Sequence, residues 1–229
     1  VGQNELPVID GSLTLPEQDG VEVVLEPKAS VDNSGNASAA VTAADLNKLL
    51  DEALEAEASV LVIVPTGAEQ ASAISVELPR CTLDNALEPL GELSMPNLTL
   101  ARILSGAGGQ DLTVNMARRT ISQAEALLNG RADVTEEQMS GASVVEVSLT
   151  SGNKSITSLA REAGAFQAGQ ACTVYQISGG GAVEKLAGVC LSRNGGLWVK
   201  VSTTQLGTFV AVPPEQPVQL PFTDVREGD

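Results

Sequence analysis

Histidine is absent from the 229-residue chain, and its absence removes several kinds of chemistry. A Ser-His-Asp triad, imidazole acid–base catalysis and the commonest transition-metal ligand all require it. Basic residues are also scarce, because 13 Lys and Arg stand against 29 Asp and Glu, a formal net charge of −16. Such a charge repels the phosphate backbone of nucleic acids and anionic membranes. We therefore expect no nucleic-acid partner.

Cysteines and long apolar runs are equally few. Three cysteines, Cys81, Cys172 and Cys190, are too few for a disulfide scaffold and lack the spacing of a zinc site. Cys172 and Cys190 lie in neighbouring strand-like segments and could pair, although three buried thiols are the simpler explanation. No apolar run approaches the roughly 18–20 residues of a membrane-spanning helix, so we expect no transmembrane segment.

The first residues lack the basic and then apolar profile of a secretory signal. This pattern leaves two interpretations, a cytosolic protein or an exported protein whose signal has already been removed.

Aromatic side chains are few, and all five follow residue 165: Phe166, Tyr175, Trp198, Phe209 and Phe222. The earlier part must therefore build its core from Val, Leu, Ile and Ala. Charge divides in a similar way, because residues 1–92 hold 17 acids and 3 bases, whereas residues 93–214 hold 8 acids and 9 bases. The two imbalances together predict two parts of different character.

The first part mixes strand and helix signals. Strand patterns fall at residues 21–25, 37–41, 60–64, 73–79, 98–100 and 111–116. The run at 60–64 is continuously apolar, which is typical of a strand buried on both faces. Thr42, with Asp45 three residues later, begins the best predicted helix, residues 43–58. Shorter helices are predicted after Thr82 and Thr120.

The second part consists of short strand patterns separated by Gly-rich turns. They fall at residues 144–149, 154–156, 173–177, 183–186, 189–191, 197–201 and 208–212. This pattern predicts a small antiparallel sandwich.

The predicted fold class is therefore α+β. An aliphatic helix-on-sheet domain over residues 20–134 precedes an antiparallel β-sandwich-like module over residues 135–213. Residues 1–19 are interpreted as a linker or edge strand, and residues 214–229 as a Pro-rich linker or tail. The two parts could also share one sheet.

Three stretches resemble one known family. Residues 134–158, VTEEQMSGASVVEVSLTSGNKSITS, are similar to a segment of secreted surface proteins of Gram-positive bacteria, in which a short helix leads into a strand pair. These proteins often carry S-layer homology repeats. Residues 174–186, VYQISGGGAVEKL, and residues 196–212, GLWVKVSTTQLGTFVAV, resemble the two hairpins that follow in that family. The resemblance implies an extracellular or cell-surface module without catalysis, whose signal peptide has been removed.

The last hairpin departs from the family pattern. The family usually has a Thr-Thr-His-Phe-Ser signature there, and this chain has Gln205, Leu206 and Gly207 in place of His-Phe-Ser. Related sandwich domains can cleave themselves at a His-Phe-Ser bond, with the serine hydroxyl as the nucleophile. Gly207 has no hydroxyl, so the resemblance does not bring that reaction to this chain.

Two groups of oxygen-bearing side chains have a simpler explanation than a site. The acids at positions 51, 52, 55 and 57 could act as paired carboxylates, but a solvated helix face accounts for them more simply. Asp32, Ser34 and Asn36 alternate like the ligands of a calcium loop, yet the terminal acid of an EF-hand is missing. We therefore predict no catalytic residues, no metal and no cofactor.

Trp198 and Tyr175 are the side chains with a recognition role to weigh. On adjacent predicted strands they could form a platform for sugars, because aromatic faces pack on sugar rings. The simpler alternative is that both side chains are part of the hydrophobic core.

The leading hypothesis is a non-catalytic structural or adhesion module of a Gram-positive cell surface, with a cell-wall polymer, a host glycan or a protein as its partner. The alternatives are a carbohydrate-binding module using Trp198 and Tyr175, and a carboxylate-based hydrolase in the acidic first part.

Overall fold

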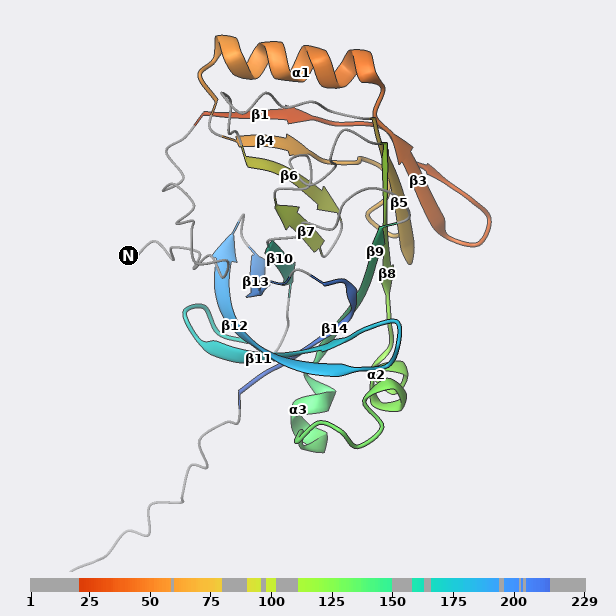
Figure 1. Ribbon diagram of the computed structural model, residues 1–229, viewed down its shortest axis with the longest axis vertical. Helices are drawn as coiled ribbons and strands as arrows, with labels where there is room; N and C mark the ends of the chain where they lie inside the picture. The colour runs from red at the N-terminus through yellow and green to blue at the C-terminus, as the bar shows by residue number, and fades with distance from the viewer. Residues whose placement is uncertain are drawn as a thin grey trace, which may run out of the picture.

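The structure is a computed structural model with a mixed α/β fold in which one large sheet dominates and helices are few (Figure 1). It describes residues 21–58, 60–79, 90–95, 98–101, 111–149, 158–162, 166–193, 196–201, 203 and 205–214. The helices within these ranges are α1 (Ala43–Glu55), α2 (Ile121–Leu128) and α3 (Glu136–Ser140).

The strands of the described residues fall into two runs along the chain. The first run is β1 (Glu22–Leu25), β2 (Ser30–Val31), β3 (Asn36–Ala40), β4 (Val60–Ile63), β5 (Ala73–Leu78), β6 (Leu90–Met95), β7 (Leu98–Ala101) and β8 (Leu112–Arg118). The second run is β9 (Ser143–Leu149), β10 (Ser158–Glu162), β11 (Ala171–Ile177), β12 (Val183–Arg193), β13 (Gly196–Val201) and β14 (Gly207–Val212).

All of these strands belong to one sheet, in the order β1-β4-β6-β7-β10-β13-β12-β11-β14-β9-β8-β5-β3-β2. Three pairs are parallel, β1 with β4, β4 with β6 and β3 with β5, and the other pairs are antiparallel. The pairs β8–β9 and β7–β10 join strands from the two sides of the predicted boundary at residue 134. The two predicted parts therefore share a sheet, which the sequence left open.

The two ends of the strand order meet in one short segment, residues 22–31. Its first half forms β1 and pairs with β4, and the pairing runs on through the Thr66 N–H, which donates to the Pro27 oxygen at 3.0 Å. The Ala29 N–H donates in turn to the Thr66 oxygen at 2.9 Å. From Ser30 onward the same segment is β2 and pairs with β3. The segment thereby closes the strand order into a ring.

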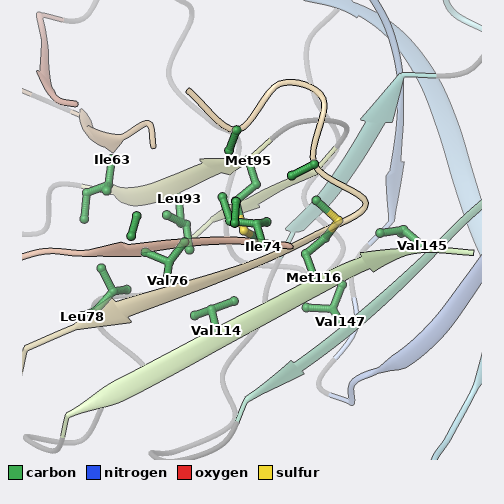
Figure 2. Packing of buried hydrophobic residues seen from close by; sticks show 14 of the residues in the cluster. Ile63, Ile74, Val76, Leu78, Leu93, Met95, Val114, Met116, Val145 and Val147 are labelled. Atoms are coloured by element: carbon green, nitrogen blue, oxygen red, sulfur yellow. The ribbon is translucent and has the colours of Figure 1, made fainter. Parts of the chain in front are cut away.

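One face of the sheet forms a single apolar core. Strand register places alternate residues on this inner face, and the buried cluster draws on β3, β4, β5, β6, β8, β9, β11, β12, β13 and β14. Figure 2 shows first-part side chains such as Val76 and Leu93 in the same core, with Met116 of β8 beside Val147 of β9. Branched aliphatic side chains fill most of this space, as the scarcity of aromatics requires.

Helix α1 lies next to β1 at one end of the molecule (Figure 1). Its N-cap is Thr42, whose hydroxyl accepts from the Asp45 N–H at 3.1 Å, as predicted. Leu46, Leu49 and Ala53 enter the inner core, whereas Leu54, also at helical spacing in the sequence, remains exposed. The helix contacts β1 and β4, so it packs beside the closing segment.

Helices α2 and α3 cover part of the outer face of the sheet at the opposite end (Figure 1). Ala124, Leu128 and Met139 from these helices form a second cluster with outward side chains of β9, β11 and β14. Arg131 follows α2 and donates to the carbonyls of Leu127 and Gly181, which ties the helix to the β11–β12 hairpin.

Most of the predicted elements within the described residues are present. Strands β2, β6 and β10 were not predicted, and the two strands predicted around Gly188 are one continuous strand, β12. Residues 1–19, most of the predicted tail, the predicted helix after Thr82 and the predicted strand at 154–156 lie outside the described residues. Among the described helices, none is both long and apolar enough to cross a membrane.

Gly188 should be intolerant of any side chain. A Cβ atom there would lie 2.9 Å from the Cys172 Sγ and 3.0 Å from the Val174 Cγ2. We expect Gly188→Ala to lower the free energy of unfolding by about 1–3 kcal/mol, because overpacking forces neighbours to move. Urea denaturation measures the change. The control is Gly179→Ala, where nothing lies within 4 Å. Equal losses of unfolding free energy in the two variants would contradict this packing.

Candidate functional site

Small side chains form two cross-strand rows on the outer face of β3, β5, β8 and β9. The first row is Asn36, Ala73, Ala117 and Glu146. The second row is Ser38, Ser75, Asn115 and Ser148. Directly paired residues share a face of a sheet, so the register places the side chains of each row beside one another.

These rows enclose a shallow hollow of about 250 Å³, which we call the polar hollow. Its depth follows from side-chain size, because the methyl groups of Ala73 and Ala117 lie in the row between the larger Asn36 and Glu146. Ser75, Asn115 and Ser148 line it from the second row. It therefore presents hydroxyl and amide groups above a floor of small side chains.

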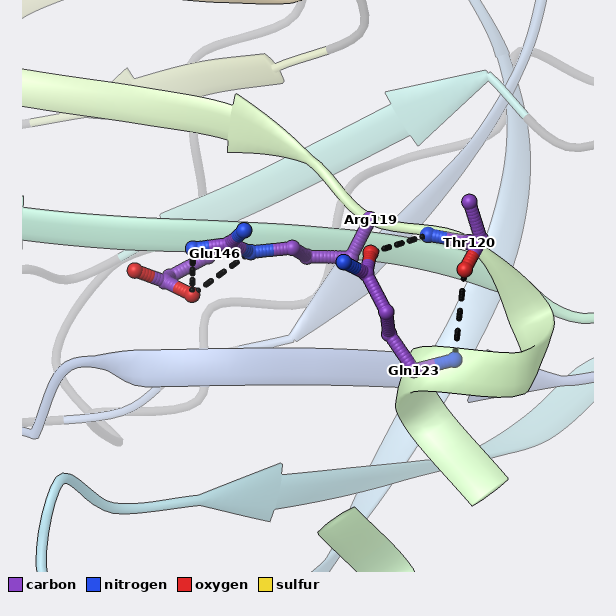
Figure 3. Close-up of polar contacts among 4 residues, drawn as sticks. All are labelled: Arg119, Thr120, Gln123 and Glu146. Carbon is purple, nitrogen blue, oxygen red and sulfur yellow. Dashed lines mark hydrogen bonds and ion pairs between the residues drawn. The ribbon is translucent and has the colours of Figure 1, made fainter. Parts of the chain in front are cut away.

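An ion pair marks the border between the polar hollow and helix α2. The Glu146 Oε2 lies 2.8 Å from the Arg119 Nε and 2.7 Å from an Arg119 terminal nitrogen, and both side chains are 36% exposed (Figure 3). Arg119 is held in place by the next residue, Thr120, which begins α2 with a reciprocal capping box to Gln123. The guanidinium thus neutralises the one carboxylate that lines the polar hollow.

The other polar groups of the hollow are neutral hydrogen-bonding groups, and they lie among the apolar side chains of Ala37, Ala73, Ile74, Met116 and Ala117. Asn115 has two amide donors and one carbonyl acceptor, whereas the Asn36 Nδ2 already donates to the Asp32 Oδ2 at 3.3 Å. Each serine hydroxyl can donate and accept. Such groups match the hydroxyl and acetamide groups of sugars. They are poorly suited to hold a metal cation, which prefers charged oxygen, nitrogen or sulfur ligands.

Trp198 and Tyr175 do not form one platform. The expectation that they lie on adjacent strands is wrong, because β12 lies between β11 and β13. Tyr175 is opposite Lys185 and Trp198 is opposite Leu191, six residues apart on β12, or about 20 Å along the strand. Tyr175 is only 5% exposed because α2 and α3 cover its ring, whereas Trp198 is half-buried.

Cys172 and Cys190 lie on neighbouring strands, β11 and β12, as predicted. The structure has both as free, buried thiols rather than as a disulfide. A hydrogen bond to Cys190 and burial raise the pKa of the Cys172 thiol, and the same hydrogen bond lowers the pKa of the Cys190 thiol. Cys81 lies outside the described residues.

The acids of the first part lie where solvation explains them. Asp51, Glu52 and Glu55 are on the exposed face of α1, and Glu52 pairs with Lys48 at 3.3 Å. Within the described ranges, no three His, Cys, Asp or Glu side chains gather so as to hold a metal ion.

Asp32, the first residue of the loop that alternates like calcium ligands, is engaged by its own turn. Its Oδ1 accepts the backbone N–H groups of Ser34 and Asn36 at 2.8 and 2.9 Å. The hydrogen bond from the Asn36 backbone is the largest cause of its lowered pKa. Glu69 has a lowered pKa for the same kind of reason, because its own backbone N–H and that of Gly67 donate to it.

The loop before β14 has a steric reason for its glycine. A Cβ atom at Gly207 would overlap the carbonyl oxygen of Ile177, so the serine of the family signature would require the backbone to move. Behind this loop, the Thr203 hydroxyl lies 2.8 Å from the Oε1 of the buried Gln176 and accepts from the Gln205 N–H. The polar side chains near Gly207 thus bind the loop to the sheet.

Sequence reasoning missed the polar hollow. Its signal was present, because β3, β5 and β8 each carry small or polar residues at alternate positions on one face. The information that was missing is the strand order, which places β3, β5, β8 and β9 side by side. No protein-family model, no curated protein and no solved structure matches this chain.

The turn at Asp32 should make stability depend on pH. Because the folded-state pKa lies below its ordinary value of 3.8, the carboxylate contributes stability above that value and loses it as the pH falls through the folded-state pKa. We expect Asp32→Ala to destabilise the protein at pH 7 and to have little effect near pH 2. Urea denaturation at both pH values tests this, with Asp51→Ala as the control for loss of one charge. If Asp32→Ala lowered the free energy of unfolding equally at both pH values, the result would contradict the role of the turn.

Proposed function

We propose that this chain is a non-catalytic structural or adhesion module of a Gram-positive cell surface, and that the polar hollow binds a neutral glycan. The observation that carries the proposal is the hollow itself, where amide and hydroxyl groups of β3, β5, β8 and β9 converge around small side chains. The likeness of residues 134–158, 174–186 and 196–212 to secreted surface proteins supports the location.

Electrostatics favours a neutral partner. The chain has a net charge of −16, which opposes the approach of anionic polymers. Glu146 is matched by Arg119, so the hollow attracts neither cations nor anions strongly. A sugar with hydroxyl and acetamide groups, such as N-acetylglucosamine, offers donors and acceptors that complement Asn115 and the nearby serines.

The binding of one sugar unit should be weak. Among the described residues that line the polar hollow there is no aromatic ring, so these residues do not supply the stacking that strengthens many sugar sites. Hydrogen bonds exchanged with water contribute little net affinity each, which points to a Kd on the order of 1 mM for a single site. A repeating polymer would compensate, because it engages many copies of the module at once.

A titration with a soluble hexamer of N-acetylglucosamine tests this function. We expect backbone amide NMR signals of β5, β8 and β9 to shift on titration, and the double variant Asn115→Ala with Ser148→Ala to lose at least tenfold in affinity. The matched control is Ser38→Ala, which removes a hydroxyl from the same row outside the hollow. Unchanged affinity in the double variant would overturn the polar hollow as the site.

The single tryptophan gives an independent readout in the same titration. Trp198 is on β13, five strand positions from β8 in the sheet order, so sugar in the polar hollow should leave its fluorescence unchanged. A fluorescence shift that survives the double variant would favour the alternative, a carbohydrate site at Trp198.

A further inference from the structure

Two cysteine side chains lie diagonally across a pair of antiparallel strands in the inner core. Cys172 on β11 is directly opposite Gly188 on β12, and Cys190 is two residues beyond Gly188 on the same strand. The even spacing places both sulfurs on the same face, and both belong to the inner cluster. Diagonal neighbours lie farther apart than directly opposed residues, so a disulfide between two short cysteine side chains requires a local shift of the strands.

The two sulfurs are in direct interaction. A hydrogen bond joins the thiols, and it shifts their pKa values in opposite directions, upward for Cys172 and downward for Cys190. Gly188 keeps the space between them open, because a Cβ at that position would lie 2.9 Å from the Cys172 Sγ. The arrangement therefore combines proximity with a hydrogen bond between the two thiols.

We propose that Cys172 and Cys190 are a modification site that closes into a cross-strand disulfide when the protein meets a small disulfide oxidant. One cysteine thiolate attacks the oxidant, displaces one small thiol and forms a mixed disulfide. The second cysteine thiolate then attacks the protein sulfur of that mixed disulfide and displaces the second small thiol. The two protein thiols lose two protons and two electrons, one S–S bond forms, and the oxidant leaves as two thiols.

The reaction requires a local opening of the sheet. Cys172 is 8% exposed and Cys190 is 1% exposed, so a small oxidant reaches them when the start of β11 separates from β12. Once formed, the bond ties β11 to β12 and closes a loop in the unfolded chain, which lowers the conformational entropy of the unfolded state and stabilises the fold. This inference is independent of glycan binding at the polar hollow, which lies on the outer face of other strands.

Oxidised glutathione is the probe for the test. Folded full-length protein is incubated with it, then unfolded, alkylated and digested for peptide mass mapping. We expect a linked peptide pair containing Cys172 and Cys190, a loss of about 2 Da from the intact mass, and a thermal midpoint higher by about 5–10 °C. A reducing agent should reverse all three changes.

The Cys190→Ser variant is the matched control, and it should give no internal link and no rise of the thermal midpoint. Mapping also distinguishes the proposed pair from any link that involves Cys81. Recovery of both cysteines as alkylated thiols, as separate glutathione adducts, or in links to Cys81 would overturn the proposal.

Discussion

The backbone of residues 22–31 hydrogen-bonds to strands at the two ends of the sheet order, and the rest of the structure depends on this closure. The first half of the segment pairs with β4 and its continuation to Thr66, and the second half pairs with β3. A sheet closed in this way has one inner face, so the strands of both halves of the chain pack into one core. Stability of either half then depends on the other, because neither can bury its inner face alone.

The closed sheet also decides where binding groups can lie. Inner positions are filled with aliphatic side chains, so polar groups are displayed mainly on the outer face. Helices α2 and α3 cover the part of that face formed by β9, β11 and β14. They do not cover the polar hollow, which lies beside Glu146. The Arg119–Glu146 pair lies at this border, where Thr120 begins α2. The polar groups of the hollow and the apolar core are thus on opposite faces of the same strands.

Local features were predictable from the sequence, and long-range pairing was not. Thr42 and Thr120 identified their helices because a capping hydroxyl and helical spacing are local signals. Alternation of apolar and polar residues identified β5 as a strand for the same reason. The partner of each strand depends on contacts between residues that are distant in sequence. The sequence patterns therefore could not predict that β12 separates Trp198 from Tyr175. For the same reason they could not predict the rows of the polar hollow.

The most direct test of the account asks whether the two halves of the chain unfold together. Leu78 is buried in β5 of the first part, and Trp198 on β13 of the second part reports its own surroundings by fluorescence. With one shared core, Leu78→Ala should lower the free energy of unfolding by about 2–5 kcal/mol, and tryptophan fluorescence and far-UV circular dichroism should report the same loss. An unchanged fluorescence transition beside a separate, earlier transition in circular dichroism would contradict the closed sheet.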